Sequence, residues 1–134
     1  MEDIRVGETM YVKAVCSENY NTYFDKRTGY FARWGKTRDS DPQVAPFPEI
    51  ADIEISVNGC IGAGKGPCAW CYKDNTNAPA TNMSLETYKK ILDKFPIIDG
   101  VPTLTQVALG ITGVQTNPAF LDILRYTRFI GIIP

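Results

Sequence analysis

The chain contains no histidine, and this absence excludes several large classes of catalytic and metal-binding site at once. Ser-His-Asp triads, Cys-His dyads, HExxH zinc proteases and histidine-ligated metals all require the missing side chain. Any chemistry that the chain performs must therefore come from cysteine, carboxylate, lysine or tyrosine side chains, or from a bound cofactor.

The chain also lacks a charge imbalance and a long hydrophobic run. Its formal net charge is -1, which gives no electrostatic basis for binding nucleic acid or an anionic membrane surface. No apolar run approaches the roughly 20 residues that cross a bilayer, and residues 1–5 lack the pattern of a secretory signal. We therefore expect a cytoplasmic protein without membrane or nucleic-acid partners, in a compartment where thiols stay reduced.

The residue pattern changes near residue 50, although the length suits about one domain. Residues 1–50 predict a β-rich extension with strands at 10–15, 22–24 and 30–34, followed by a Pro-rich linker at 37–49. The aromatic residues of this segment predict one face of a small sheet and its core or, alternatively, an aromatic binding face: they are Tyr11, Tyr23, Phe24, Tyr30, Phe31 and Trp34.

Residues 51–134 predict alternating strands and helices. The expected elements are strands at 52–57, 106–109 and 132–134, and helices that begin after Ser84 and Asn117. Such alternation implies parallel strands joined by right-handed crossovers. We therefore predict an α/β fold, namely a partial (β/α) TIM-like barrel preceded by the β-rich segment. Its open edge suggests a truncated gene, a fragment or a subunit that requires more protein.

Three of the four cysteines lie close together in the sequence, as Cys60, Cys68 and Cys71 with the spacing C-x7-C-x2-C. A close pair and one more distant cysteine can place three thiolates on one face of a loop, and thiolates hold iron–sulfur clusters. A [4Fe–4S] cluster with three protein ligands leaves one iron open for a small molecule. Backbone amides of the intervening glycines could donate to cluster sulfurs: these are Gly62, Gly64 and Gly66.

Cys68-Ala69-Trp70-Cys71 resembles the second half of the C-x3-C-x-Φ-C motif of the radical S-adenosylmethionine superfamily, with Trp70 at the aromatic position. The first spacing is seven residues where the usual motif has three, and longer first spacings occur in the superfamily. In this family the second barrel strand ends in a Gly-rich motif whose backbone binds the amino group of S-adenosylmethionine. Gly110-Ile111-Thr112-Gly113 matches that motif in position but lacks its usual Glu and Pro, so only backbone roles carry over, to Gly110, Ile111 and Thr112.

The resemblance, which covers residues 51–134, implies a metal site and a cofactor. Cys60, Cys68 and Cys71 would bind a [4Fe–4S] cluster whose open iron chelates S-adenosylmethionine, and Trp70 would lie near the adenine or serve only in packing. Reductive cleavage would yield a 5′-deoxyadenosyl radical that abstracts hydrogen from an unknown substrate. An electron donor such as flavodoxin or ferredoxin is implied as a partner.

Other interpretations of the cysteine segment stay open at this point. A structural zinc site could use all four cysteines, with Cys16 as the fourth ligand, in a non-catalytic interaction module. Otherwise Cys16 is expected to be a buried apolar residue. Residues 59–66 read G-x4-G-K-G, one residue short of a phosphate loop, and Gly66 replaces the hydroxyl that such a loop offers to Mg²⁺. A chain that binds a cluster without turning over is a further possibility.

Overall fold

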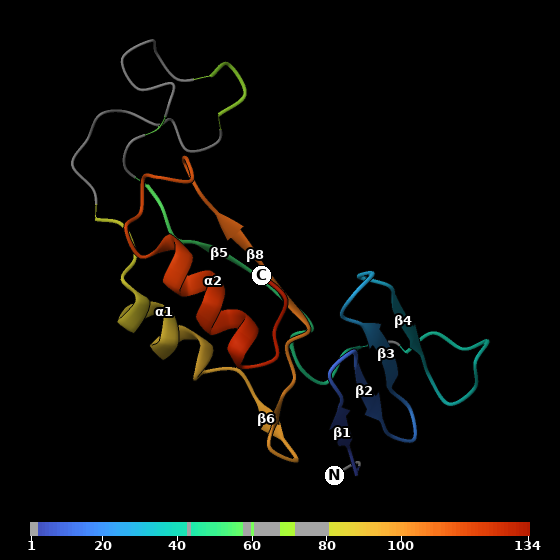
Figure 1. The fold of residues 1–134 in the computed structure, drawn as a ribbon. Coiled ribbons are helices and arrows are strands. Elements are labelled where there is room, and N and C mark those ends of the chain that lie inside the picture. Colours follow the sequence, from blue (N-terminus) through green and yellow to red (C-terminus); the bar gives the residue numbers. More distant parts are fainter. Residues whose placement is uncertain (1–2, 43, 58–59, 61–67, 72–80) are drawn as a thin grey trace.

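The computed structural model consists of an antiparallel sheet beside a unit of parallel strands and helices (Figure 1). It describes residues 3–42, 44–57, 60, 68–71 and 81–134. Of the helices in these residues, none is long and apolar enough to cross a membrane.

The N-terminal part forms a four-stranded antiparallel sheet in the order β1-β2-β3-β4. Its strands are β1 (Arg5–Glu8), β2 (Val12–Cys16), β3 (Asn21–Asp25) and β4 (Phe31–Trp34). The predicted hairpin is confirmed, because β3 and β4 pair antiparallel with Tyr23 opposite Ala32. β1 was not predicted, because its one buried residue, Val6, lies among exposed residues that show no apolar alternation.

The C-terminal part is built on one parallel strand pair. β5 (Ile50–Glu54) and β8 (Gln106–Gly110) pair in parallel, and α1 (Leu85–Leu92) and α2 (Phe120–Phe129) pack on them. A single parallel bridge joins Gln106 to Ile133 where a third strand is expected. The buried core of this part comprises Ile53, Ile55, Tyr88, Leu92, Leu104, Val107, Ile123 and Ile132.

The predicted barrel is wrong. The described residues form three small sheets, two of them antiparallel, with only two helices, and no barrel closes. Closure requires a ring of paired strands at a common tilt, whereas one parallel pair and one bridge leave most of that ring absent from the described residues. The small, mostly β architecture therefore replaces the expected α/β barrel.

A short hairpin connects the two parts, and its Asp99-Gly100 turn is a hairpin signal that the predicted elements did not include. β6 (Ile97–Ile98) and β7 (Val101–Pro102) pair antiparallel, and Asp99 and Gly100 between them have φ of 53° and 78°, as two-residue hairpin turns require. Its apolar side chains pack on the core of the N-terminal sheet. The Asp99 carboxylate also accepts from the backbone N–H of Val6 at 3.1 Å. The hairpin thus fixes the sheet beside the helical unit.

Lys13 is buried at this junction, with 1% of its surface exposed. Its ammonium donates to the carbonyls of Pro102 at 2.9 Å and Leu104 at 2.6 Å, and lies 3.5 Å from a carboxylate oxygen of Glu8. Desolvation lowers the pKa of Lys13 to about 8, although the Glu8 carboxylate acts in the opposite direction. Lys26, which also pairs with Glu8, adds to the lowering.

The free energy of unfolding should therefore rise with pH between about 8 and 10.5, relative to a Lys13→Met variant. In this window the unfolded chain still holds the proton that folded Lys13 has lost, so raising the pH favours the folded state. The gain is at most about 1.4 kcal/mol per pH unit. Urea unfolding of both proteins at about pH 7 and about pH 10 measures it. An unchanged difference between the two proteins would refute the lowered pKa.

Candidate cysteine site

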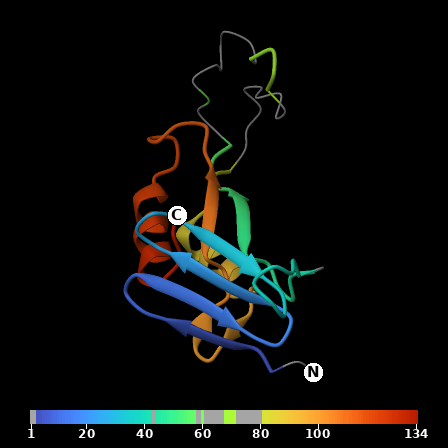
Figure 2. The ribbon, with the colours of Figure 1, turned by 90° about the vertical axis from the view of Figure 1, so that its right-hand side faces the viewer.

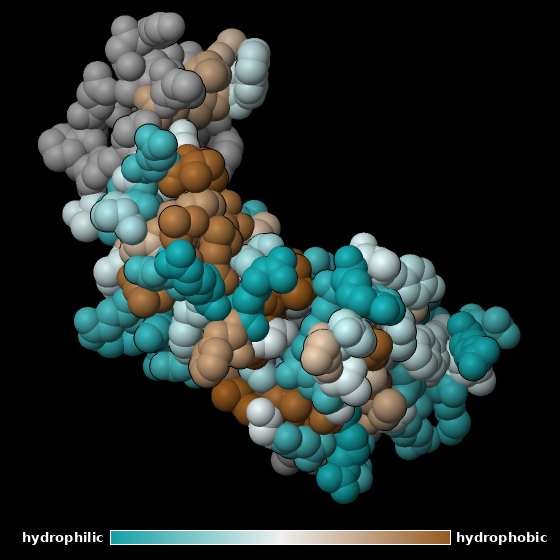
Figure 3. Space-filling model, in the orientation of Figure 1, coloured by the Kyte–Doolittle hydropathy of each residue, from teal (hydrophilic) through white to brown (hydrophobic). Residues whose placement is uncertain are grey.

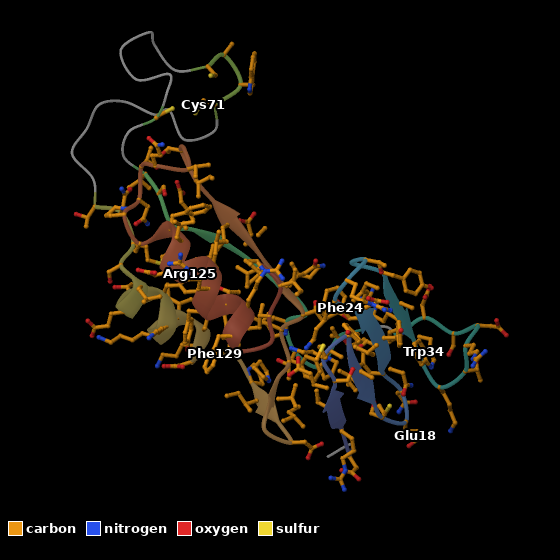
Figure 4. All side chains as sticks on the ribbon, in the orientation of Figure 1. Glu18, Phe24, Trp34, Cys71, Arg125 and Phe129 are labelled. Carbon is orange, nitrogen blue, oxygen red and sulfur yellow. The ribbon has the colours of Figure 1, made fainter. Side chains whose placement is uncertain are left out.

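The cysteine segment, which is the part of the chain between Val57 and Asn82, begins just beyond the carboxyl end of β5. Because β5 and β8 are parallel, their carboxyl ends lie at the same edge, and Gly110–Thr112 leaves β8 there. Figure 4 shows Cys71 beyond this edge, at the end of the molecule away from the antiparallel sheet. The structure thus brings the cysteine segment and the Gly-rich motif to one edge, which is the usual place for ligands in parallel sheets.

The three cysteines differ in exposure. Cys60 and Cys71 are half-buried and Cys68 is exposed. The N–H of Cys71 donates to the carbonyl of Cys68 at 2.8 Å, so this close pair is held by a tight turn. Among the described residues no three His, Cys, Asp or Glu side chains are gathered as a metal site, so Cys60 does not join the pair in this structure. The predicted roles of Gly62, Gly64 and Gly66 lie outside the described residues, as does the phosphate-loop segment at 59–66 apart from Cys60.

Cys16 is exposed, contrary to the prediction that it is buried. Alternation along β2 turns Val15, which is 2% exposed, toward the core and leaves Cys16 at the strand end facing solvent. β2 lies in the lower sheet in both Figure 1 and Figure 2, and Cys71 lies at the upper end of the molecule in Figure 4. This structure therefore does not assemble a zinc site from all four cysteines.

The predicted cofactor-binding residues are accessible to different degrees. Trp70 is 86% exposed, so it serves no core packing in this structure. Ile111 is 36% exposed, and the Thr112 hydroxyl donates to that of Thr116 at 3.1 Å. Figure 3 shows hydrophobic surface near this edge, where β8 ends and α2 begins, and its exposed apolar side chains include Ile111, Val114 and Leu121.

Gly110 has a structural reason to be glycine. A Cβ atom built there would lie 3.0 Å from Cα of Glu54, which is too close for an ordinary contact. The carbonyl of Gly110 also accepts from the N–H groups of Ile55 at 2.9 Å and Ser56 at 3.2 Å. The close approach of β5 and β8 by itself therefore accounts for this glycine, independently of any bound cofactor.

Asn117 binds the residues at the two ends of the cysteine segment, which we call its base. The sequence does not predict this role. Asn117 was expected to cap the second helix, but α2 begins at Phe120, with Ala119 at the cap position. The Asn117 side chain instead donates to the carbonyls of Ile55 at 2.7 Å and Met83 at 2.9 Å, and accepts from Ala119 N–H at 2.8 Å. It thereby joins the residues before and after the cysteine segment to the start of α2.

The side chain of Asn82 also makes hydrogen bonds across this base. Its side-chain oxygen accepts from the N–H of Val57 at 2.9 Å, and its amide donates to the carbonyl of Thr116 at 2.5 Å. The N–H of Met83 donates to Ile55 at 3.0 Å. Residues 57 and 82, which flank the cysteine segment, are therefore held together. The only sequence signal was an asparagine close to each helix start, which ordinarily indicates a cap.

The hydroxyl of Ser56 is buried and has no hydrogen-bond partner among the described residues. Leaving a buried hydroxyl unpaired is costly, and Ser56 stands where β5 passes into the cysteine segment. A pocket of about 340 Å³ also lies at this base, between Val57 and the first turn of α1, with the side chains of Asn82 and Thr87 in its wall.

The donor types of the cysteine segment suit an iron–sulfur cluster, although in this structure Cys60 stands apart from the close pair of Cys68 and Cys71. The donors are soft thiols without histidine, two of them are fixed by one turn, and the segment is anchored at both ends. No protein-family model, curated protein or solved structure matches the chain.

Proposed function

We propose that the chain is a radical S-adenosylmethionine protein, in which Cys60, Cys68 and Cys71 hold a [4Fe–4S] cluster. The observation that carries this proposal is the anchored cysteine segment at the carboxyl edge of β5 and β8, beside Gly110–Thr112. The match of Cys68-Ala69-Trp70-Cys71 to the family motif gives the site its proposed chemistry.

Each residue of the site has a task under this proposal. The thiolates of Cys60, Cys68 and Cys71 would hold the cluster, and the backbone of Gly110–Thr112 would hydrogen-bond the methionine end of S-adenosylmethionine. The exposed ring of Trp70 stacks on its adenine. When bound, the cluster supplies one electron for reductive cleavage of S-adenosylmethionine, which permits hydrogen abstraction from a substrate.

The exposed position of Cys68 suits electron delivery. An electron donor such as flavodoxin or ferredoxin would dock over this part of the segment, because a cluster bound there would lie close to the surface. Asn117 and Asn82 would keep the segment over the sheet edge while the donor binds.

Electron paramagnetic resonance of the anaerobically reconstituted, dithionite-reduced protein tests the proposal. We expect a reduced [4Fe–4S] signal that shifts when S-adenosylmethionine is added, because the cofactor binds the open iron directly. Methionine alone and adenosine alone are the matched additions, and each should shift the signal less than the complete cofactor does.

Two outcomes would contradict the proposal. A cluster signal that is indifferent to S-adenosylmethionine would show a cluster without the cofactor site. A colourless protein that contains zinc and no iron would show a structural metal site.

A further inference from the structure

The outer face of the antiparallel sheet carries an aromatic slot that the proposed cluster site does not use. Tyr30, Ala32 and Trp34 share this face, because side chains two residues apart along a strand point the same way. The N–H of Asp25 donates to Tyr30 at 2.9 Å, which continues the β3–β4 ladder as far as Tyr30. Tyr23 lies directly opposite Ala32 and therefore on the same face.

The small side chain of Ala32 forms the floor of this slot. At about 3.4 Å per residue, the backbones of Tyr30 and Trp34 lie roughly 14 Å apart, and on this face of β4 only the methyl group of Ala32 stands between them. The rings of Tyr23 and Tyr30 pack at 6.3 Å with a tilt of 57°. The pocket has a volume of about 390 Å³ and is lined by Tyr23, Tyr30, Ala32, Arg33, Trp34 and Arg38. Figure 4 shows Trp34 far from Cys71.

The charges at this slot favour an anionic ligand. Arg38 is exposed and has no ion-pair partner in the described part of the chain, whereas Arg33 is held by Glu49 at 3.0 Å. The nearby Asp25 carboxylate pairs with Arg27 at 2.9 Å, which balances its charge. An aromatic slot without arginine would suit a cationic ligand. Here the positive charge of Arg38 repels a cation.

We propose that this slot binds a mononucleotide. The base stacks on the rings of Trp34 and Tyr30 above Ala32, and the phosphate binds the guanidinium of Arg38. Planar bases stack on aromatic side chains whatever their sequence, and guanidinium groups match phosphate oxygens in geometry and charge. The pocket has the size of a small-molecule site, which suits one nucleotide.

The fluorescence of Trp34 can report binding at this slot once Trp70, the other tryptophan of the chain, is replaced. In a Trp70→Phe protein without cluster, AMP should quench the Trp34 fluorescence saturably, and adenosine should do so with lower affinity. Inorganic phosphate should leave the fluorescence unchanged, because it does not stack. The Cys68→Ala variant should bind AMP with the same affinity, which keeps this site distinct from any S-adenosylmethionine site.

Arg38 and Lys36 are both exposed, so their alanine variants form a matched pair. Arg38→Ala should weaken AMP binding about tenfold or more and leave adenosine binding unchanged, because it removes a charge-assisted contact to phosphate. Lys36→Ala should change neither affinity, since Lys36 pairs with Glu18 at 2.8 Å and does not line the slot.

Tyr30→Ala should weaken the binding of AMP and adenosine alike. Tyr30 is 62% exposed, so circular dichroism should show the fold intact. The absence of saturable quenching by AMP would overturn the proposal. Equal AMP affinities of the Arg38→Ala and Lys36→Ala variants would overturn it as well.

Discussion

Cys68→Ala should abolish the stable iron–sulfur cluster in the reconstituted protein, as should Cys60→Ala and Cys71→Ala. A cluster held by three thiolates has no spare ligand, and the histidine-free chain offers no replacement imidazole. We expect iron and sulfide contents near zero and loss of the broad visible absorption after anaerobic reconstitution. The unmodified protein, reconstituted in parallel, should be brown.

Cys16→Ala is the matched control for these variants, because Cys16, like Cys68, is an exposed thiol but lies in β2. It should retain the full iron and sulfide content. If Cys16→Ala lost the metal as completely as Cys68→Ala, the three-ligand site would be wrong. A site of all four cysteines would then replace it, and metal analysis would identify zinc or iron.

Asn117→Ala should lower the free energy of unfolding by on the order of 3 kcal/mol. Asn117 is 3% exposed, and its loss would leave the carbonyl of Met83 and the N–H of Ala119 unpaired, whereas the carbonyl of Ile55 would keep the N–H of Met83. Buried polar groups left unpaired in this way cost about 1–3 kcal/mol each before the structure relaxes. Urea unfolding followed by circular dichroism measures the loss.

Asn21→Ala provides the comparison within the same chain. The Asn21 side chain also makes two hydrogen bonds, accepting from Ser17 at 3.2 Å and donating to Gly35 at 3.0 Å, but it is only half-buried. Its replacement should cost about 1 kcal/mol and leave cluster content unchanged. An Asn117→Ala protein as stable as the Asn21→Ala protein would show that Asn117 does not fix the base of the cysteine segment.

Local signals predicted several elements well. The β3–β4 hairpin follows from two apolar runs around a polar turn, and both strands are present. The helix after Ser84 is confirmed as α1, with the Ser84 hydroxyl accepting from the N–H of Thr87 at 3.1 Å. The parallel pairing of β5 with β8 follows from their separation by a helix. The hairpin and the helix depend on residues near one another in the chain, whereas the parallel pairing of β5 with β8 follows from the order of the elements.

Other features were missed or wrongly predicted, mainly where residues far apart in the chain come together. Asn117 has the residue type and position of a helix cap, yet its amide bonds to Ile55 and Met83, which lie 62 and 34 positions away. The barrel was inferred from the order of elements, but element order does not say how many strands pair. The β6–β7 hairpin was not predicted because its strands of two residues each are too short for any period to be read, although the Asp99-Gly100 turn between them is a typical hairpin signal.

The sequence by itself determined the donor chemistry of this protein: three closely spaced thiols, no histidine, and an aromatic residue inside the close pair. Only the tertiary structure decided where polar groups meet, because period-two alternation says which residues share a face but not which face is covered. Thus Lys13 is buried and Cys16 is exposed on the same strand. Lys13 is buried because the carbonyls of Pro102 and Leu104, about 90 positions away in the chain, lie against that face of the sheet.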